Sequence, residues 1–342
     1  MLQSRLMSQK IEQLLVKLMK FVGNLWSMAA KFIGSLVLFL ILMVMLFGNL
    51  GNQASQAKLS EKVVRPGDKN EKLAIVNLNG VIVADAPSDD PFTLTSGFVS
   101  ARKINEILAE LAKDDSVKAI MLEINSPGGS VVGSDEIYRK VLEVRETKPV
   151  VAQMGEIAAS GGYYLASAAN KIVASPATLT GSIGTIMQVP EFSGLYDKLG
   201  IRFQTIKAGK LKDMGASDRE LIQEERDVLQ ALANEAQEQF LAAIVQGRRM
   251  EEGELRELAD GRIYSGKQAK DNGLVDELGS FESAIDYTAA LAQLKNPQVV
   301  EYSKDSFLDT LLQASANTSP FSFLFSEFVP EQQFGVYYVA NF

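Results

Sequence analysis

Short apolar runs alternate with glycine-containing turns and helical segments in the middle of this chain. Lys118–Ile124 is one such run, and it ends in Asn125–Ser130, a turn with one proline and two glycines. Apolar residues then recur at helical spacing over residues 134–147. The pattern repeats in Pro149–Met154, Ser160–Asn170 and Lys171–Ala174. Because strands that alternate with helices are joined by right-handed crossovers, the sequence predicts an α/β domain with a mainly parallel sheet.

The domain predicted around this pattern covers residues 73–295. It starts with Leu73–Ala84, a β-branched run that contains the turn residues Asn79 and Gly80. The other predicted elements are helices over residues 100–114 and 280–294, strand-like pieces over 180–187 and 202–206, and a long helix from the capping box Ser217–Glu220 toward Arg248.

A membrane anchor is predicted ahead of this domain. Residues 32–50 carry no charge, and as a helix they would rise roughly 28 Å, close to the thickness of the hydrocarbon core. A cleaved signal peptide is the alternative. However, the basic region before the span is long, residues 1–31, and the small-residue patterns after it are weak.

Charge predicts the orientation of the anchor. Residues 1–31 carry five Lys/Arg and one acid, a net charge of +4, which leaves 29 Lys/Arg against 41 acids, or −12, for the rest. The positive-inside rule then predicts a cytoplasmic N-terminus. Residues 1–31 are also amphipathic, so they would lie on the inner membrane surface or dock on a partner. Residues 51–72 are polar with Gly and Pro and predict a linker, and the acidic domain argues against nucleic-acid binding.

The chain contains no histidine and no cysteine. This excludes Ser-His-Asp and Cys-His catalysis, disulfides, and metal sites that use thiolate or imidazole ligands. An enzyme with this composition has to use Ser, Thr, Lys, Asp, Glu, Tyr or backbone amides. We expect no cofactor and no metal.

Ser160 precedes Gly161 and Gly162 at the start of a predicted helix. There, unpaired N–H groups would point at whatever the hydroxyl attacks, which makes one half of an oxyanion hole. The turn Ser126–Gly129 could supply the other half, since its glycines let backbone amides approach a carbonyl oxygen. Close helix–sheet packing and an ordinary turn explain the same residues.

A serine nucleophile in this chain needs a lysine as its base, because no histidine is present. Lys207, Lys210 and Lys212 cluster in one segment, where mutual repulsion would favour a neutral amine. A solvated basic loop is the alternative. Spacing does not choose among the three lysines.

Five motifs in one order resemble the signal peptide peptidase A family, over about residues 73–294. They are Ile124–Ser130, Ala158–Tyr164, Leu179–Gly184, Lys207–Asp213, and Asp260–Arg262 with Gly273–Asp276. The resemblance implies a membrane-anchored serine peptidase with a Ser/Lys dyad on the Clp-protease/crotonase fold, which is built from repeated ββα units.

Transferred by position, the resemblance makes Ser160 the nucleophile and Lys212 the general base. Ser182 corresponds to a serine that orients the lysine amine. Gly129 and Gly161 would supply the two N–H groups of the oxyanion hole.

The resemblance also implies a homo-oligomeric ring in which neighbouring protomers contribute the serine and the lysine. Substrates would be signal-peptide remnants and other short apolar peptides at the bacterial inner membrane, with the catalytic domain on the periplasmic side. The tail, residues 296–342, has eight Phe and Tyr residues among its last 22. We expect it to make subunit contacts or to occupy an apolar substrate groove. The alternative is a second short membrane-associated end or a partly disordered one.

Two other functions remain open at this point. A crotonase-like acyl-CoA enzyme would share the oxyanion hole, but nothing in the sequence indicates a CoA site. A catalytically silent membrane scaffold would use the same oligomer, although Ser160, Lys212 and Ser182 would then have no purpose.

Overall fold

The computed structural model describes residues 59–85, 97–303 and 337–339, together with residues 31, 34–39 and 42. The chain divides into a small unit, Met1–Lys58, and a large unit, Leu59–Phe342. In the small unit the described residues are helical, and the side chains of Leu36–Phe39 and Leu42 are 48–61 % exposed. Most of the predicted anchor lies outside the described residues, and no described helix is long and apolar enough to cross a membrane.

The large unit is built on a nine-stranded sheet in the order β1, β12, β2, β5, β7, β8, β11, with β9 paired to the end of β7 and β10 paired to β9. These strands are β1 Ser60–Arg65, β2 Asp68–Asn79, β5 Val117–Ser126, β7 Val150–Ala159, β8 Lys171–Ala174, β9 Leu179–Gly181, β10 Ile263–Ser265, β11 Glu277–Leu278 and β12 Pro297–Ser303. From β12 to β11 the neighbours are parallel, whereas β1 and β10 pair antiparallel. The predicted mainly parallel sheet is confirmed.

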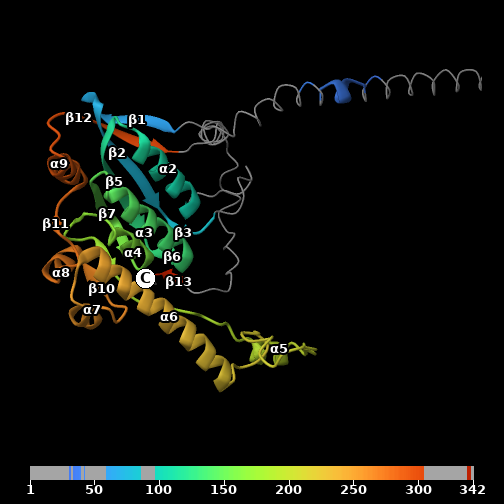
Figure 1. Cartoon of the computed structure of the whole chain (residues 1–342). Helices are drawn as coiled ribbons and strands as arrows, with labels where there is room; N and C mark the ends of the chain where they lie inside the picture. The colour runs from blue at the N-terminus through green and yellow to red at the C-terminus, as the bar shows by residue number, and fades with distance from the viewer. Residues whose placement is uncertain are drawn as a thin grey trace, which may run out of the picture. The chain divides into compact units, whose positions relative to one another are not determined.

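Alternate residues of the central strands face two different helix layers. In β2, Ala74 and Val76 face a core shared with α2 Ala101–Lys113, α3 Val131–Arg145, α4 Gly161–Ala166 and α6 Gln223–Arg248. Leu73 and Ile75 face the other side, where they pack with α9 Phe281–Leu291. Figure 1 shows α9 on one side of the sheet and α2 and α3 on the other. Both faces are covered, which explains the nearly continuous apolar runs of these strands.

A second, four-stranded sheet has the order β13, β6, β3, β4. Its strands are β3 Val81–Val83, β4 Phe98–Ser100, β6 Gly128–Ser130 and β13 Tyr337–Val339. The chain passes from β2 through β3 and β4 to α2, and from β5 through β6 to α3. A long strand, a short strand and a helix thus recur, in agreement with the Clp-protease-like fold expected from the sequence.

The folded domain is longer at both ends than its composition suggests. Residues 60–72, expected in a linker, form β1 and the start of β2, and residues 297–303, expected in the tail, form β12 between them. β1 is almost entirely exposed because it is an edge strand. Its polar sequence therefore resembles that of a loop, and β1 is recognised as a strand only by its pairing with β12.

Two expected elements differ in the region before α6. Residues 202–206 form no strand, and α6 begins at Gln223 rather than near Ser217. The backbone carbonyl of Ser217 instead accepts a hydrogen bond from Phe192 N–H at 2.7 Å. The carboxylate of Glu225 caps the helix, accepting a hydrogen bond from Ile222 N–H at 3.2 Å.

The motif Gly273–Asp276 binds the C-terminal end of α6 to the sheet. Arg248, in the last turn of α6, donates to the Asp276 carboxylate at 2.7 Å, and the same carboxylate accepts from Ile172 N–H at 2.8 Å. Burial by itself would raise the pKa of Asp276, but the hydrogen bond and charge of Arg248, together with the hydrogen bonds from Ile172 and Lys171, outweigh it and the pKa is lowered. This motif therefore has a structural role, away from the predicted nucleophile.

Candidate active site

Ser160 stands between the end of β7 and the first residue of α4. Its backbone has φ 54° and ψ −118°, an unfavourable combination for a residue with a side chain. The side chain is fully buried, and its Oγ has no hydrogen-bond partner among the described residues. A buried hydroxyl without a partner, on a strained strand-to-helix turn, is an unusual and costly arrangement that points to a functional role.

Gly129 and Gly161 lie against each other beside this serine. A Cβ atom on Gly161 would come within 2.5 Å of Ser134 Oγ and 3.2 Å of Gly129 N, and one on Gly129 would come within 2.0 Å of the Ile82 carbonyl oxygen. Backbone atoms exclude any side chain at Gly129, and a side chain at Gly161 would have to displace the Ser134 hydroxyl. As the first residue of α4, Gly161 has an N–H group without an intrahelical acceptor. The structure thus brings together the two predicted oxyanion-hole residues.

The side chains of Asn125 and Ser126, for which the sequence predicts no role, accept hydrogen bonds from the backbone around the turn after β5. Gly128 N–H donates to the buried Oγ of Ser126 at 3.1 Å, and Ile157 N–H donates to Asn125 Oδ1 at 3.2 Å. The first bond closes the turn after β5, and the second ties the carboxyl ends of the neighbouring parallel strands β5 and β7, where ligands bind in open α/β sheets. Their only sequence signal is their place in the Asn-Ser-Pro-Gly-Gly turn.

Ser182 lies next to Ser160, the predicted nucleophile. Ser160 N–H donates to the Gly181 carbonyl at 2.8 Å, and Ser182 follows with a left-handed φ of 49°. No described residue hydrogen-bonds to the Ser182 hydroxyl. It opens into a pocket of about 360 Å³, lined also by Thr185, Asn234 and Gln237. This pocket has room for a side chain that would reach Ser182 from outside.

The three candidate lysines have different surroundings. Lys207 is ion-paired with Asp213, and Lys210 is ion-paired with Glu224. Lys212 is exposed and has no ion pair or side-chain hydrogen bond with any described residue. A carboxylate partner favours the charged ammonium form, whereas a general base has to be neutral. These contacts favour Lys212 over the other two.

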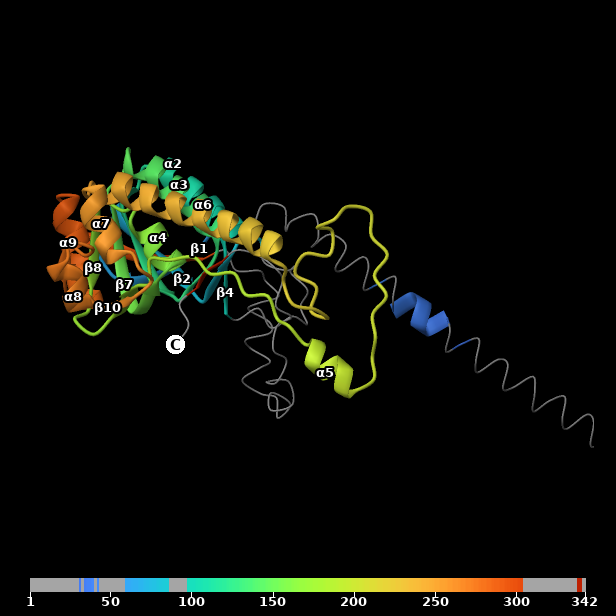
Figure 2. The ribbon, with the colours of Figure 1, turned by 90° about the horizontal axis from the view of Figure 1, so that it is seen from below.

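Lys212 does not reach Ser160 within this protomer. Ser182 shares its pocket with Gln237 of α6, while the lysine segment is fastened to Glu224, near the start of the same helix. Those two positions are 13 residues apart, which is roughly 20 Å along an α-helix. Figure 2 shows the segment with α5 Ser193–Lys198 beyond the N-terminal end of α6, away from α4.

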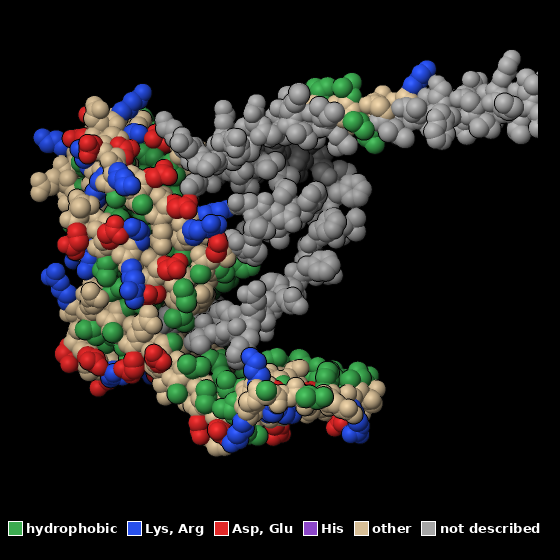
Figure 3. Space-filling view, turned by 45° about the vertical axis from the view of Figure 1, so that its right-hand side comes forward, with side chains coloured by type: hydrophobic (Ala, Val, Ile, Leu, Met, Phe, Trp, Pro, Cys, Tyr) green, Lys and Arg blue, Asp and Glu red, His purple; other side chains and the backbone are tan. Residues whose placement is uncertain are grey.

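Residues 184–222, here called the arm, lead out from Ser182 and return to α6. No residue in the arm is buried. Its exposed apolar side chains include Leu195 at 53 %, Leu199 at 62 %, Phe203 at 55 % and Ile206 at 100 %. Figure 3 shows hydrophobic side chains gathered over this protruding segment. Exposed apolar surface on this scale marks an interaction surface.

Strand β13 lies on the strand that carries Gly129. Tyr337, Tyr338 and Val339 pair antiparallel with Ser130, Gly129 and Gly128. The other described edge of β6 is taken by β3. β13 thus occupies the edge from which an extended chain would approach Gly129, one of the two predicted oxyanion-hole glycines. The rest of the predicted tail beyond Ser303 lies outside the described residues.

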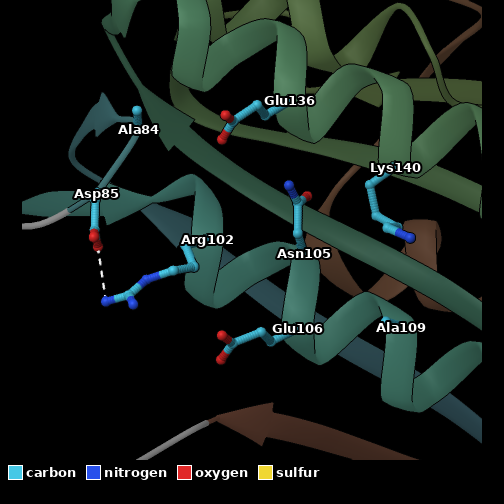
Figure 4. Close-up of a pocket in the computed structure, with 8 residues that line it drawn as sticks. All are labelled: Ala84, Asp85, Arg102, Asn105, Glu106, Ala109, Glu136 and Lys140. Atoms are coloured by element: carbon cyan, nitrogen blue, oxygen red, sulfur yellow. Dashed lines mark ion pairs between the residues drawn. The ribbon is translucent and has the colours of Figure 1, made fainter.

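A second hollow lies away from this site, between α2 and α3. Figure 4 shows Arg102, Asn105 and Glu106 from α2 opposite Glu136 and Lys140 from α3. Arg102 is ion-paired with Asp85 at 3.0 Å. The volume of this hollow, about 480 Å³, is larger than that of the Ser182 pocket. None of the predicted site residues lines the hollow.

Two protein-family models match the chain over ranges that together contain all the predicted site residues. The family model of Clp protease matches residues 96–180, and that of peptidase family S49 matches residues 143–295. The chain is 36 % identical to a putative signal peptide peptidase SppA of Enterococcus faecium, over 73 % of this chain and 72 % of that protein.

Other relatives are matched over different shares of their length. A putative protease of Methanocaldococcus jannaschii is 43 % identical over 59 % of this chain and 65 % of that protein. Protease 4 of Haemophilus influenzae is 35 % identical over 70 % of this chain, which spans only 38 % of that longer protein. The chain belongs to the signal peptide peptidase A family of serine peptidases, peptidase family S49.

Proposed function

We propose that this protein is a membrane-anchored endopeptidase in which Ser160 of one protomer and Lys212 of its neighbour form the catalytic dyad. The observation that carries the proposal is the buried Ser160 hydroxyl beside Gly129 and Gly161, which has no hydrogen-bond partner in the part of the chain that the structure describes. Lys212, which has no carboxylate partner among the described residues, lies on an apolar arm that is fastened near the start of α6, too far from Ser160 to serve the serine of its own chain. A second copy of the chain would cover the arm and bring the amine to the Ser182 pocket.

The mechanism follows from these positions. Neutral Lys212 takes the proton of Ser160 Oγ while Oγ attacks the peptide carbonyl carbon. The N–H groups of Gly129 and Gly161 bind the resulting oxyanion, and losing one such donor typically costs about 2.7 to 4 kcal/mol of transition-state stabilisation. The C–N bond breaks, and the protonated lysine gives its proton to the leaving amine. Water then hydrolyses the acyl ester through the same lysine, with Ser182 orienting the amine.

Extended peptides are the substrates that this site suits best. The antiparallel pairing of β13 on Gly128–Ser130 demonstrates that this edge accepts an extended backbone. Substrates that add to a sheet edge are held by main-chain hydrogen bonds, so a folded protein would have to unfold locally to enter. Short apolar remnants of cleaved signal peptides meet this requirement. The uncharged residues 32–50 would hold the domain at the periplasmic face of the inner membrane, where such remnants arise.

Covalent labelling tests this function. The full-length protein in detergent or nanodiscs is treated with a peptidyl phosphonate that reacts with activated serines, and the labelled residue is located by mass spectrometry. We expect one phosphonate on Ser160, and none on Ser182 or in an Ser160→Ala variant. An assembled oligomer that stays unlabelled would instead favour a catalytically silent scaffold.

Removing β13 should increase activity on short peptides. Because β13 and substrate would compete for the same edge of β6, truncation after Ser303 should raise kcat/KM about tenfold, through KM, if the edge is free only about a tenth of the time. The measurement is hydrolysis of a fluorogenic peptide. Tyr338→Pro in the full-length chain is the matched variant, since it keeps the tail but disrupts the pairing. An unchanged KM in both variants would contradict the competition.

A further inference from the structure

Lys212 lies in a part of the arm that no helix or strand supports. Residues 209–216 form successive turns, and Lys212 itself is exposed. A general base has to be held within a fraction of an ångström of its working position, because small misplacements cost large factors in rate. Something other than regular secondary structure therefore has to fix this backbone.

Arg219 contacts the residue next to Lys212 in two ways. Its Nη2 donates to the backbone carbonyl of Asp213 at 3.1 Å and lies 3.0 Å from Asp213 Oδ1. Lys207 pairs with the same carboxylate. Hydrogen bonds from Lys207 and Arg219 lower the pKa of Asp213 to about 2, so this partner is ionised at any working pH. Arg219 thus binds both the main chain and the side chain of Asp213, the residue that follows Lys212.

The same guanidinium is anchored to α6. Nη1 donates to Glu225 Oε2 at 2.9 Å and Nη2 donates to Glu225 Oε1 at 2.6 Å, a two-point fork that lysine cannot reproduce. Glu225 is fully buried, and it also caps the helix through Ile222 N–H. Its position is therefore set by α6 rather than by the arm. The fixed sequence of contacts runs from α6 through Glu225 and Arg219 to Asp213.

We propose that Arg219 is a positioning residue for catalysis, which fixes the Lys212 turn to the start of α6 by bridging Asp213 and Glu225. This inference rests on the proposed role of Lys212. It predicts that Arg219 acts only through the lysine of its own chain. Loss of Arg219 should therefore impair the lysine half of the site and leave the serine half intact.

The first test measures kinetics of the full-length Arg219→Ala protein. We expect kcat to fall about 100-fold with KM within a factor of about three, while oligomer size stays that of wild type. Low millimolar guanidinium should restore part of kcat, and NaCl at equal ionic strength should not. Arg226→Ala is the matched control, an exposed arginine in the first turn of α6 whose side chain has no ion pair among the described residues.

The second test asks which half of the site is damaged. Co-assembly of Arg219→Ala with Ser160→Ala chains should restore activity, because the second chain supplies an intact lysine and the first an intact serine. Co-assembly of Arg219→Ala with Lys212→Ala chains should not. A merely structural weakening of the arm would reduce both mixtures alike.

Three outcomes overturn the inference. They are an Arg219→Ala protein with kcat within about threefold of wild type, restoration by Lys212→Ala chains, or equal loss in both mixtures. If Arg219→Ala fails to assemble, Arg219→Lys replaces it as the test, because lysine keeps the charge but cannot make the two-point contact with Glu225. A reduced kcat in an intact oligomer then supports the inference, and a wild-type kcat overturns it. Failure of the proposed function is distinguishable, because wild type and Ser160→Ala would then hydrolyse peptide equally.

Discussion

Replacing Ser160 or Lys212 with alanine should abolish peptide hydrolysis, by at least about 10⁴-fold in kcat, because the two side chains act as one unit. The oligomer should remain intact. Lys212 is exposed in the protomer and Ser160 loses only its hydroxyl, so neither change removes an apolar core contact. The measurement is turnover of a fluorogenic peptide panel at matched oligomer concentration, with size determined on the same samples.

Lys210→Ala provides the control for charge in the same segment. Its side chain is 71 % exposed and its ammonium is paired with Glu224, so we expect wild-type turnover, and Lys207→Ala should also stay active. An inactive Lys210→Ala protein together with an active Lys212→Ala protein would show that the wrong lysine has been chosen. Activity that falls from acid to neutral pH would indicate a carboxylate base instead of a lysine.

Mixing the two inactive variants should restore activity. When Ser160→Ala and Lys212→Ala chains are co-expressed, an intact serine can meet an intact lysine from its neighbour, and random one-to-one assembly in a ring gives about a quarter of the wild-type sites. The expected change is from no detectable turnover to about a quarter of the wild-type rate. Few other single experiments on this protein would have so large a positive effect.

The control for mixing is the doubly inactive chain. Ser160→Ala/Lys212→Ala chains mixed with either single variant should give no turnover, since no serine then meets a lysine. Lack of restoration in verified mixed oligomers of the two single variants would contradict a shared site. It would require the arm to fold back onto its own protomer, which the contact between Lys210 and Glu224 opposes.

Predictions from sequence were most accurate where local patterns decide the outcome. The helix at residues 100–114 is α2, with Ser100 as its N-cap, and the helix at 280–294 is α9, with Ser280 as its N-cap. The predicted helix start at Ser217 was wrong, because Arg219 and Glu225 bond to each other across the turn and the helix begins only at Gln223. A capping pattern in the sequence does not show that an ion pair between two nearby residues will favour a different helix start.

The polar ends of the domain were misassigned for a related reason. β1 and β12 pair residues more than 200 positions apart, such as Val63 with Val300. Partners so distant leave no local periodicity, and the exposed edge strand β1 has none of the apolar alternation that predicts a strand. β13 belongs to the same class, since only its pairing with β6 identifies it.

The sequence by itself determined the chemistry that is open to this protein. Without histidine or cysteine a nucleophilic serine needs a lysine, and the order of the glycine motifs identifies the family and the α/β domain. These properties follow from residue type and local spacing. The tertiary structure alone decided that Gly129 and Gly161 lie against each other. Among the described residues, it also decided that the buried Ser160 hydroxyl has no hydrogen-bond partner and that, of the three lysines, only Lys212 has no carboxylate partner. Each of these depends on contacts between segments that are distant in sequence or on how one turn folds, and such contacts are set by packing rather than by pattern.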